Sequence, residues 1–274
     1  MWLAALIYTH RITGVLPYCT FIVNAGKLYS VAPWSQRLYV HSGRAGETSS
    51  LLAQQMRCEL LAGGVYPAAK DGSQDAKLTD LLFAVSCVRP SVRVLLPDGS
   101  KFCTWELPAE PSAVGYDSRR GLLYAADFNR QMYVYSARGQ LVRQWSLNPQ
   151  VAGSNDCYVE RLAVDSKGDV YALVTRVYSP YLQLCVYSSH GGHKSTWRGQ
   201  YLHIAIDCQD HIYLTRPCGR DRAYDSIVSL FTPSGTCVGE LRGTLVPTHP
   251  CGLATSNGLL YVANQADGQI YVAS

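Results

Sequence analysis

The sequence predicts an all-β fold: one domain over residues 1–274, built as a six-bladed β-propeller. Two observations lead to this prediction. A short strand-rich unit recurs six times along the chain, and its anchor aromatic residues are Tyr29, Phe83, Tyr124, Tyr171, Tyr213 and Tyr261. Repeats of about 40–50 residues made of short strands are typical of propeller blades. In addition, no stretch has the apolar period of an amphipathic helix.

Each unit is expected to contain four strands. The inner strands are predicted upstream of the anchors, at FIVN (21–24), AVGYD (113–117), LAVD (162–165), IAID (204–207) and GLATS (252–256). Glycine-containing turns such as Ala137-Arg138-Gly139 indicate hairpins, because glycine adopts positive φ at little cost. In the second unit two interpretations stay open: residues 64–70 (GVYPAAK) form the inner strand and an insertion follows, or the inner strand is degraded.

The two ends of the sequence predict how the ring closes. The sixth unit lacks its outermost strand, and the first unit is preceded by a spare apolar strand at residues 4–11 (AALIYTHR). We therefore expect the N-terminal strand to complete the C-terminal blade, which also protects an exposed sheet edge.

The apolar run at residues 1–8 is too short for a membrane span, which needs roughly 20 residues. We therefore expect this run to form a buried strand, and we expect no membrane partner.

Composition narrows the class of protein. Hydrophobic residues make up 47% of the chain and charged residues 16%, which excludes a disordered chain. The ten cysteines form no C-x-x-C pair, so neither a zinc site nor a compact disulfide framework is expected. Buried reduced thiols and the absence of glycosylation sequons favour a cytoplasmic location, with an extracellular one as the alternative. We expect no metal and no cofactor.

The repeats resemble a known family. The third unit contains Val114-Gly115-Tyr116-Asp117, Gly121, Leu123-Tyr124-Ala125-Ala126-Asp127, Asn129 and Met132-Tyr133-Val134-Tyr135, and the sixth contains Leu260-Tyr261-Val262-Ala263-Asn264. These segments resemble NHL repeats, and the resemblance covers nearly the whole chain. NHL propellers form the recognition end of many tripartite-motif ubiquitin ligases, where they bind RNA or protein. No C-x-x-C series of a RING or B-box accompanies the repeats here, so the resemblance implies the recognition module alone.

A binding surface is expected on one rim of the propeller. Loops between the second and third strands of each blade, and loops between blades, open on the same side; we call this side the loop rim. Its predicted partner-binding residues are arginines and aromatics: Trp34, Arg37, Arg89, Phe128, Arg130, Arg176, Tyr178, Tyr181, Arg216, Arg220, Arg222 and Tyr224. Asn129, Asn155, Tyr158, Tyr201 and His249 are expected beside them.

Three classes of function fit this rim. The favoured one is a non-catalytic recognition module, monomeric as an isolated domain, that binds a protein partner through arginines and aromatic rings. The alternative is an RNA-binding propeller, because arginine pairs with phosphate and rings stack on bases. A solvated surface without a partner is also open.

The second alternative to protein binding is a metal-dependent hydrolase or lyase, which needs several Asp, Asn or His side chains converging on the channel. The residues Asn24, Asp117, Asp165 and Asp207 end inner strands, where bonds to turn amides are expected instead. Asp127 is expected to brace its own loop. His190-Gly-Gly-His193 is expected to be a surface turn, and His203 and His249 are too few for a metal site.

Overall fold

The chain forms β-strands joined by turns wherever its structure is described. The computed structural model describes residues 8–12, 20–24, 27–32, 37–42, 50–53, 60–66, 79–147, 157–176, 182–217, 226–241, 250–264 and 269–273. These residues form the strands β1 to β24 and no helix. Within these ranges, there is accordingly no helix with the length and apolar character needed to cross a membrane.

The strands pair into six four-stranded antiparallel sheets, which we number as blades in chain order. Blade 1 comprises β2 (Thr20–Asn24), β3 (Lys27–Ala32), β4 (Arg37–Ser42) and β5 (Ser50–Ala53). Blade 2 comprises β6 (Leu60–Tyr66), β7 (Thr79–Ser86), β8 (Ser91–Leu95) and β9 (Lys101–Glu106). Blade 3 comprises β10 (Pro111–Asp117), β11 (Leu122–Asp127), β12 (Gln131–Ser136) and β13 (Leu141–Ser146). Blade 4 comprises β14 (Cys157–Val164), β15 (Val170–Arg176), β16 (Leu182–Tyr187) and β17 (His193–Tyr201). Blade 5 comprises β18 (His203–Ile206), β19 (Ile212–Pro217), β20 (Ser226–Phe231) and β21 (Cys237–Leu241). Blade 6 comprises β22 (Pro250–Ser256), β23 (Leu259–Asn264), β24 (Gln269–Ala273) and β1 (Tyr8–Ile12).

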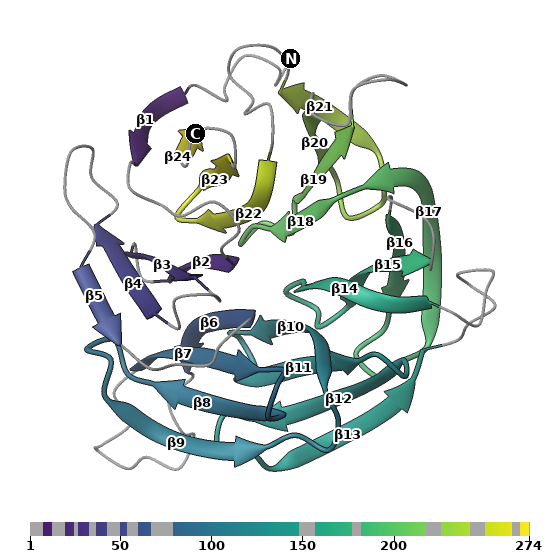
Figure 1. The fold of residues 1–274 in the computed structure, drawn as a ribbon. Coiled ribbons are helices and arrows are strands. Elements are labelled where there is room, and N and C mark those ends of the chain that lie inside the picture. Colours follow the sequence, from purple (N-terminus) through teal and green to yellow (C-terminus); the bar gives the residue numbers. More distant parts are fainter. Residues whose placement is uncertain are drawn as a thin grey trace.

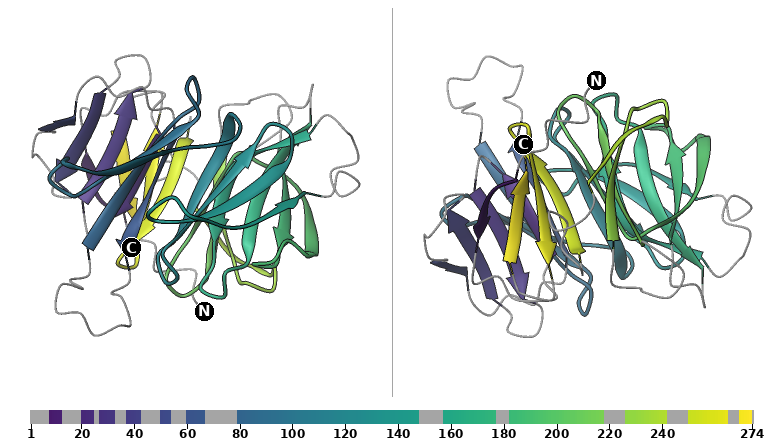
Figure 2. Two further views of the ribbon diagram at one scale, coloured as in Figure 1. Left: turned by 90° about the horizontal axis from the view of Figure 1, so that it is seen from below. Right: turned by 90° about the horizontal axis from the view of Figure 1, so that it is seen from above.

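The sheets are arranged around a common centre, with the first strand of each blade innermost (Figure 1). Seen from the side, the sheets stand next to one another like the blades of a propeller (Figure 2). The predicted all-β propeller class is confirmed. Because the strands of a blade are antiparallel, the turn between its first two strands and the turn between its last two strands lie on the same rim of the propeller. We call this rim the turn rim. The loop rim lies on the opposite side.

The chain closes the ring with its own N-terminal strand. Strand β1 pairs antiparallel with β24, so that His10 lies opposite Val272 and Ile12 lies opposite Ile270. This confirms the predicted closure. The strand begins at Tyr8, and residues 1–7 of the predicted N-terminal strand lie outside the described residues.

The inner strand of blade 2 exists, but it begins earlier than predicted. Strand β6 runs from Leu60 to Tyr66, which pair with Val85 and Thr79. It therefore contains residues 64–66 of the predicted strand, and residues 67–70 lie outside the described part of the chain. The physical reason for the earlier start is visible in the sequence, because apolar residues 60–62 precede the glycines and Ala62 is buried.

The hydrophobic core lies between neighbouring blades. All six anchor aromatic residues are buried, with exposures from 0% at Phe83 to 9% at Tyr213. Each large cluster of buried side chains joins two blades: one contains Tyr124 of blade 3 and Val159 of blade 4. A blade therefore buries its two faces only against its neighbours, as expected for radial repeats.

A tryptophan on the outer strand connects each of three blades to the next. Trp145 on β13 meets Tyr124 of its own blade edge to face, with ring centroids 6.3 Å apart. It also covers Gly191 in the β16–β17 hairpin of blade 4, where φ is +86° and an added Cβ would lie 2.3 Å from Trp145 Cγ. Only glycine therefore fits beneath this ring.

The same arrangement occurs in blades 2 and 4. Trp105 covers Gly139 and Trp197 covers Gly235, both in the outer hairpin of the following blade. The added Cβ would lie 2.6 Å from Trp105 and 3.2 Å from Trp197. In both cases the ring also meets an anchor aromatic of its own blade at a centroid distance of 6.3 Å. The contact is therefore a repeated feature of the interfaces between blades.

Replacing the covered glycine of blade 4 is expected to destabilise the fold. Gly191→Ala combines a left-handed backbone with a clash against Trp145, and we expect it to lower the free energy of unfolding by roughly 2–5 kcal/mol. The control is Gly258→Ala, at φ +75° with no described atom within 4 Å of the new Cβ, which should cost only about 1–2 kcal/mol. Thermal and urea unfolding followed by circular dichroism measures both. Equal losses in the two variants would contradict the packing role of the tryptophan.

Candidate functional site

Two aromatic residues of neighbouring blades come together on the loop rim. Phe128 lies in the turn between β11 and β12 and is 46% exposed. Its ring centroid is 5.0 Å from that of Tyr158, near the start of β14, at an interplanar angle of 54°. Both residues are predicted from the sequence to lie on this rim, and the structure places them in contact across blades 3 and 4.

The turn that presents Phe128 is fixed by the acidic residue before it. Asp127 is 2% exposed. Its Oδ1 accepts a hydrogen bond from the Gln131 amide at 2.7 Å, and its Oδ2 accepts one from the Tyr133 hydroxyl at 3.4 Å. The Arg130 amide donates to the Asp127 carbonyl at 3.2 Å. The predicted bracing role of Asp127 is confirmed, and it holds Phe128 at the tip of the turn.

Arg130 adopts an uncommon backbone conformation in the same turn. Its φ is +67°, a region that non-glycine residues occupy in only a few per cent of cases. Its carbonyl accepts a hydrogen bond from the Leu147 amide at 2.8 Å, so the end of the outer strand holds the turn from the other side. An arginine kept where glycine would fit more easily is a feature that clusters at binding sites.

The neighbouring turn of blade 2 extends the exposed surface. Val88 is 67% exposed, and Arg89 beside it is also exposed. The Cys87 thiol donates to the carbonyl of Pro111, the first residue of β10, at 3.2 Å. This contact connects the turn of blade 2 to blade 3. The exposed apolar and basic side chains of the two blades therefore lie next to one another on the loop rim.

Arg216 lies on the loop rim, but its guanidinium is held by contacts within blade 5. Its Nε donates to Ser229 Oγ at 2.9 Å, and its Nη2 forms an ion pair with Glu240 Oε1. The guanidinium thus joins β19, β20 and β21 within blade 5. Because its charge is balanced by Glu240, Arg216 contributes little positive potential to the rim.

The remaining predicted rim residues are placed only in part. Arg37 begins β4 and Arg176 ends β15, so both flank loops of this rim, and only their backbone is described. Tyr201 is 4% exposed and belongs to the core. The other predicted residues lie outside the described part of the chain: Trp34, Tyr178, Tyr181, Arg220, Arg222, Tyr224, Asn155 and His249.

On the turn rim, the acidic residues near the ends of the inner strands bond to turn amides, as predicted. Oδ1 of Asp165 accepts hydrogen bonds from the amides of Lys167 at 2.9 Å and Asp169 at 2.8 Å, and its Oδ2 accepts one from the Tyr171 hydroxyl at 3.5 Å. Burial raises the pKa of the Asp165 carboxyl. Asp117 and Asp207 accept bonds from their own turn amides in the same way. These three carboxylates are therefore part of the scaffold.

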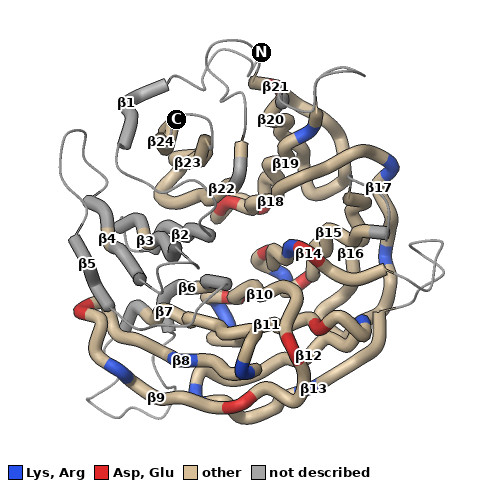
Figure 3. The backbone as a smooth tube through the Cα atoms, in the orientation of Figure 1, with Lys and Arg blue, Asp and Glu red and all other residues tan. Residues whose placement is uncertain are grey.

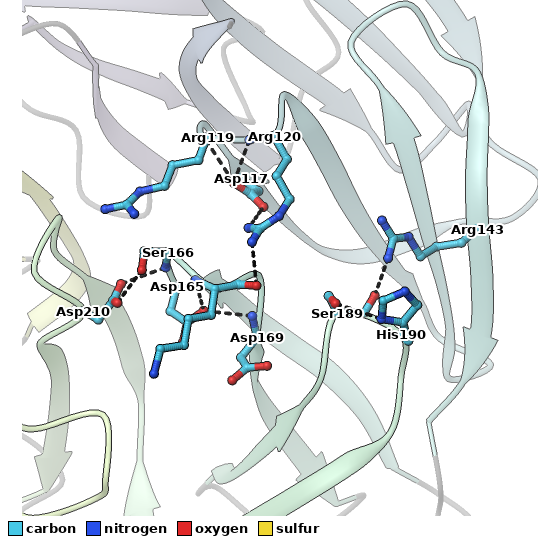
Figure 4. A network of polar contacts seen from close by, with 11 residues as sticks. Asp117, Arg119, Arg120, Arg143, Asp165, Ser166, Asp169, Ser189, His190 and Asp210 are labelled. Carbon is cyan, nitrogen blue, oxygen red and sulfur yellow. Dashed lines mark hydrogen bonds and ion pairs between the residues drawn. The ribbon is translucent and has the colours of Figure 1, made fainter.

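Side chains of the turn rim also connect one blade to another (Figure 4). Arg120 binds Asp117 Oδ2 at 2.7 Å through Nη1, and through Nη2 it donates to the Lys167 carbonyl of blade 4 at 2.7 Å. The Ser166 amide and hydroxyl both donate to the carboxylate of Asp210 in blade 5, at 2.7 and 2.5 Å. Sequence reasoning missed this network, although the polar residues directly after each recurrent Asp were a signal for it.

The histidines show no metal-binding arrangement in the described structure. Burial lowers the pKa of His203 to about 3, and the nearby Arg161 charge acts in the same direction, so its imidazole is neutral. His190 and His193 are exposed in the hairpin between β16 and β17, and the predicted surface turn is confirmed. Across the described residues, no group of three His, Cys, Asp or Glu side chains could hold a metal ion.

Comparison with known proteins supports the fold. No protein-family model matches the sequence, and no curated protein matches it. A streptogramin B lyase structure aligns with a TM-score of 0.59 at 11% identity, over 93% of this chain and 78% of that one. The chain has a β-propeller fold. The structure of Raptor from Chaetomium thermophilum aligns with a TM-score of 0.58 at 9% identity. This alignment covers 90% of this chain and 22% of the Raptor chain. At these identities the similarity shows the fold alone.

Two turn-rim aspartates should respond differently to the same substitution. In Asp165→Asn the amide oxygen still accepts both turn N–H groups, so we expect a change in unfolding free energy below about 1 kcal/mol. Asp117→Asn removes the charged partner of Arg120 and should cost about 1.5–3 kcal/mol. Urea unfolding at neutral pH measures both changes, and equal losses would contradict the assignment.

The pH dependence of Asp165 gives a second readout. Because burial raises the folded-state pKa of the Asp165 carboxyl above its ordinary value of 3.8, the folded protein binds this proton more tightly than the unfolded chain does. Wild-type stability relative to Asp165→Asn should therefore rise as pH falls from the raised pKa toward 3.8. Unfolding midpoints of the two proteins compared across this window test the sign. A relative loss of wild-type stability there would contradict it.

Proposed function

We propose that this chain is a six-bladed propeller of NHL type that acts as a non-catalytic recognition module and binds a protein partner through the loop rim. The observation that carries the proposal is the exposed contact of Phe128 with Tyr158. Aromatic side chains of this kind are frequent hot spots of protein interfaces. The module is proposed to act as a monomer.

The geometry of the rim favours binding of a protein surface. Burying a phenylalanine side chain contributes about 1.5–3 kcal/mol relative to leaving it exposed, and Phe128 still exposes nearly half of its surface. Asp127 and the Leu147 amide fix the turn in advance, so little conformational entropy remains to be lost on binding. Val88 and Arg89 add apolar and basic contacts beside this pair.

The charges of the rim favour protein over RNA. An RNA surface would present continuous positive charge, but Arg216 is paired with Glu240. Glu106 and Glu110 are exposed at the end of β9 and in the loop after it, and Glu106 lies opposite Ser91 at the start of β8, two residues after Arg89. Lys, Arg, Asp and Glu are interspersed along blades 2 to 4 (Figure 3). Interspersed charges match a protein partner with its own mixed surface.

The thiols support a reducing location such as the cytoplasm as part of this proposal. Among the cysteines with described side chains, the buried Cys157 and Cys185 are free thiols. Burial raises the pKa of the Cys185 thiol to about 11, which keeps it protonated and unreactive at neutral pH. Cys185 therefore acts as a small apolar residue in the core.

Removing the exposed ring should weaken partner binding. We expect Phe128→Ala to reduce affinity roughly 10- to 100-fold, because a hot-spot aromatic contributes about 1.4–2.8 kcal/mol. Immobilised wild-type and variant protein are incubated with nuclease-treated cell lysate, and recovered proteins are quantified by mass spectrometry. Affinities for a recovered partner are then measured by isothermal titration calorimetry.

Phe102→Ala is the matched control. Phe102 is 44% exposed, close to the 46% of Phe128, but it lies on the outer strand β9. The variant should retain every partner that the wild-type protein binds. Recovery of the same proteins at the same level with Phe128→Ala, or an equal loss with Phe102→Ala, would count against a loop-rim site. Binding lost on nuclease treatment would favour RNA instead.

A further inference from the structure

We propose that the turn rim of blades 3 to 5 is a second interaction surface, and that it binds an acidic, Asp- and Glu-rich segment of a protein. This surface is opposite to the loop rim and independent of the function proposed above. It consists of the turns between the first two strands and the hairpins between the last two strands of these blades, at residues 118–121, 137–140, 165–169, 188–192, 207–211 and 232–236. The inference rests on how charge is distributed between the surface and the interior of this rim.

The carboxylates of the turn rim are mostly withdrawn from solvent. Asp117 is 3% exposed and Asp165 is 5% exposed, and the side chain of Asp207 is 11% exposed. All three are occupied by turn amides, as described above. Asp210 is partly exposed, but both of its oxygens accept hydrogen bonds from Ser166. Negative charge on this rim therefore serves internal contacts.

The cations of the same rim reach the solvent. The side chain of Arg120 is 37% exposed, although it binds Asp117. Arg119, Arg138 and Lys167 are exposed as well. Lys194, at the foot of the blade 4 hairpin, forms an ion pair with Asp169, so its charge is balanced although 51% of its side chain is exposed. The outward face of the rim thus presents the exposed cations Arg119, Arg138 and Lys167, while the charges of Arg120 and Lys194 are balanced by Asp117 and Asp169.

The arginines of this surface are held in place before any ligand binds. Arg120 is fixed by Asp117 and the Lys167 carbonyl, and its pKa is raised by the hydrogen bond to Asp117, so it is always charged. Arg119 donates through Nη2 to the Cys208 carbonyl of blade 5 at 3.3 Å, and Figure 4 shows it extended toward that blade. Planar guanidinium groups bind carboxylates through paired hydrogen bonds. Fixed orientation lowers the entropic cost of that binding.

The features of the rim favour an acidic peptide over RNA. Recognition of single-stranded RNA relies on rings on which bases stack. None of the turn-rim residues named above is Phe, Tyr or Trp. The net charge of the whole chain is only +4, which is modest for a nucleic-acid surface. Local carboxylate recognition requires neither stacking nor a large overall charge.

The test uses a fluorescein-labelled poly-glutamate peptide and the purified full chain, with binding followed by fluorescence anisotropy. The double variant Arg119→Gln/Lys167→Gln removes two exposed charges while the Asp117–Arg120 and Ser166–Asp210 contacts remain. We expect its affinity to fall roughly 10- to 100-fold, at about tenfold for each 1.4 kcal/mol lost. Binding by the wild-type protein should also weaken as salt is raised.

The control is Arg89→Gln, which removes an exposed arginine from the loop rim and should leave peptide affinity unchanged. Thermal unfolding of all variants verifies that they fold like the wild-type protein. The proposal is overturned if the wild-type protein does not bind the peptide, or if Arg89→Gln weakens binding as much as the double variant. It is also overturned if poly(U) RNA binds more tightly than the peptide and loses affinity in the double variant.

Discussion

The structure of this propeller depends on the contact between an outer-strand tryptophan and the hairpin glycine of the next blade. Trp145 is clamped between Tyr124 of its own blade and Gly191 of blade 4. Its indole N–H has no hydrogen-bond partner in the described structure, so the contact holds through apolar burial and dispersion, which must exceed the cost of an unsatisfied donor, about 1–3 kcal/mol. Because the ring tolerates no Cβ beneath it, neighbouring blades are fixed in relative position. The geometry of both rims therefore depends on this contact between tryptophan and glycine.

The two rims use acidic residues in the same structural way but present different chemistry. On the loop rim, Asp127 braces a turn whose tip exposes Phe128. On the turn rim, Asp117 braces a turn whose tip exposes Arg119. A buried carboxylate that bonds to backbone amides fixes the turn and leaves the tip residues free to vary. One face thus exposes an aromatic ring and the other exposes guanidinium groups, so the two faces differ in their chemistry.

Much of the fold could be predicted from the sequence, because repeated residues report repeated structure. The anchor aromatics predicted the blades, and the recurrent Asp residues predicted their own turn bonds. Other features were invisible because they depend on contacts between distant residues. Arg216 looked like a free loop cation until the fold placed Glu240 beside it. Pairing in blade 2 begins at Leu60, ahead of the predicted strand, since neighbouring strands decide where it starts.

The central claim is that the loop rim is the recognition surface. Hydrogen exchange of the protein, free and saturated with a partner recovered by affinity purification, tests it most directly. We expect slower exchange at residues 87–90, 128–131 and 158, with the outer strands β9 and β13 unchanged. Protection confined to the outer strands or to the turns at 118–120 and 166–168, with the loop rim unaffected, would contradict it.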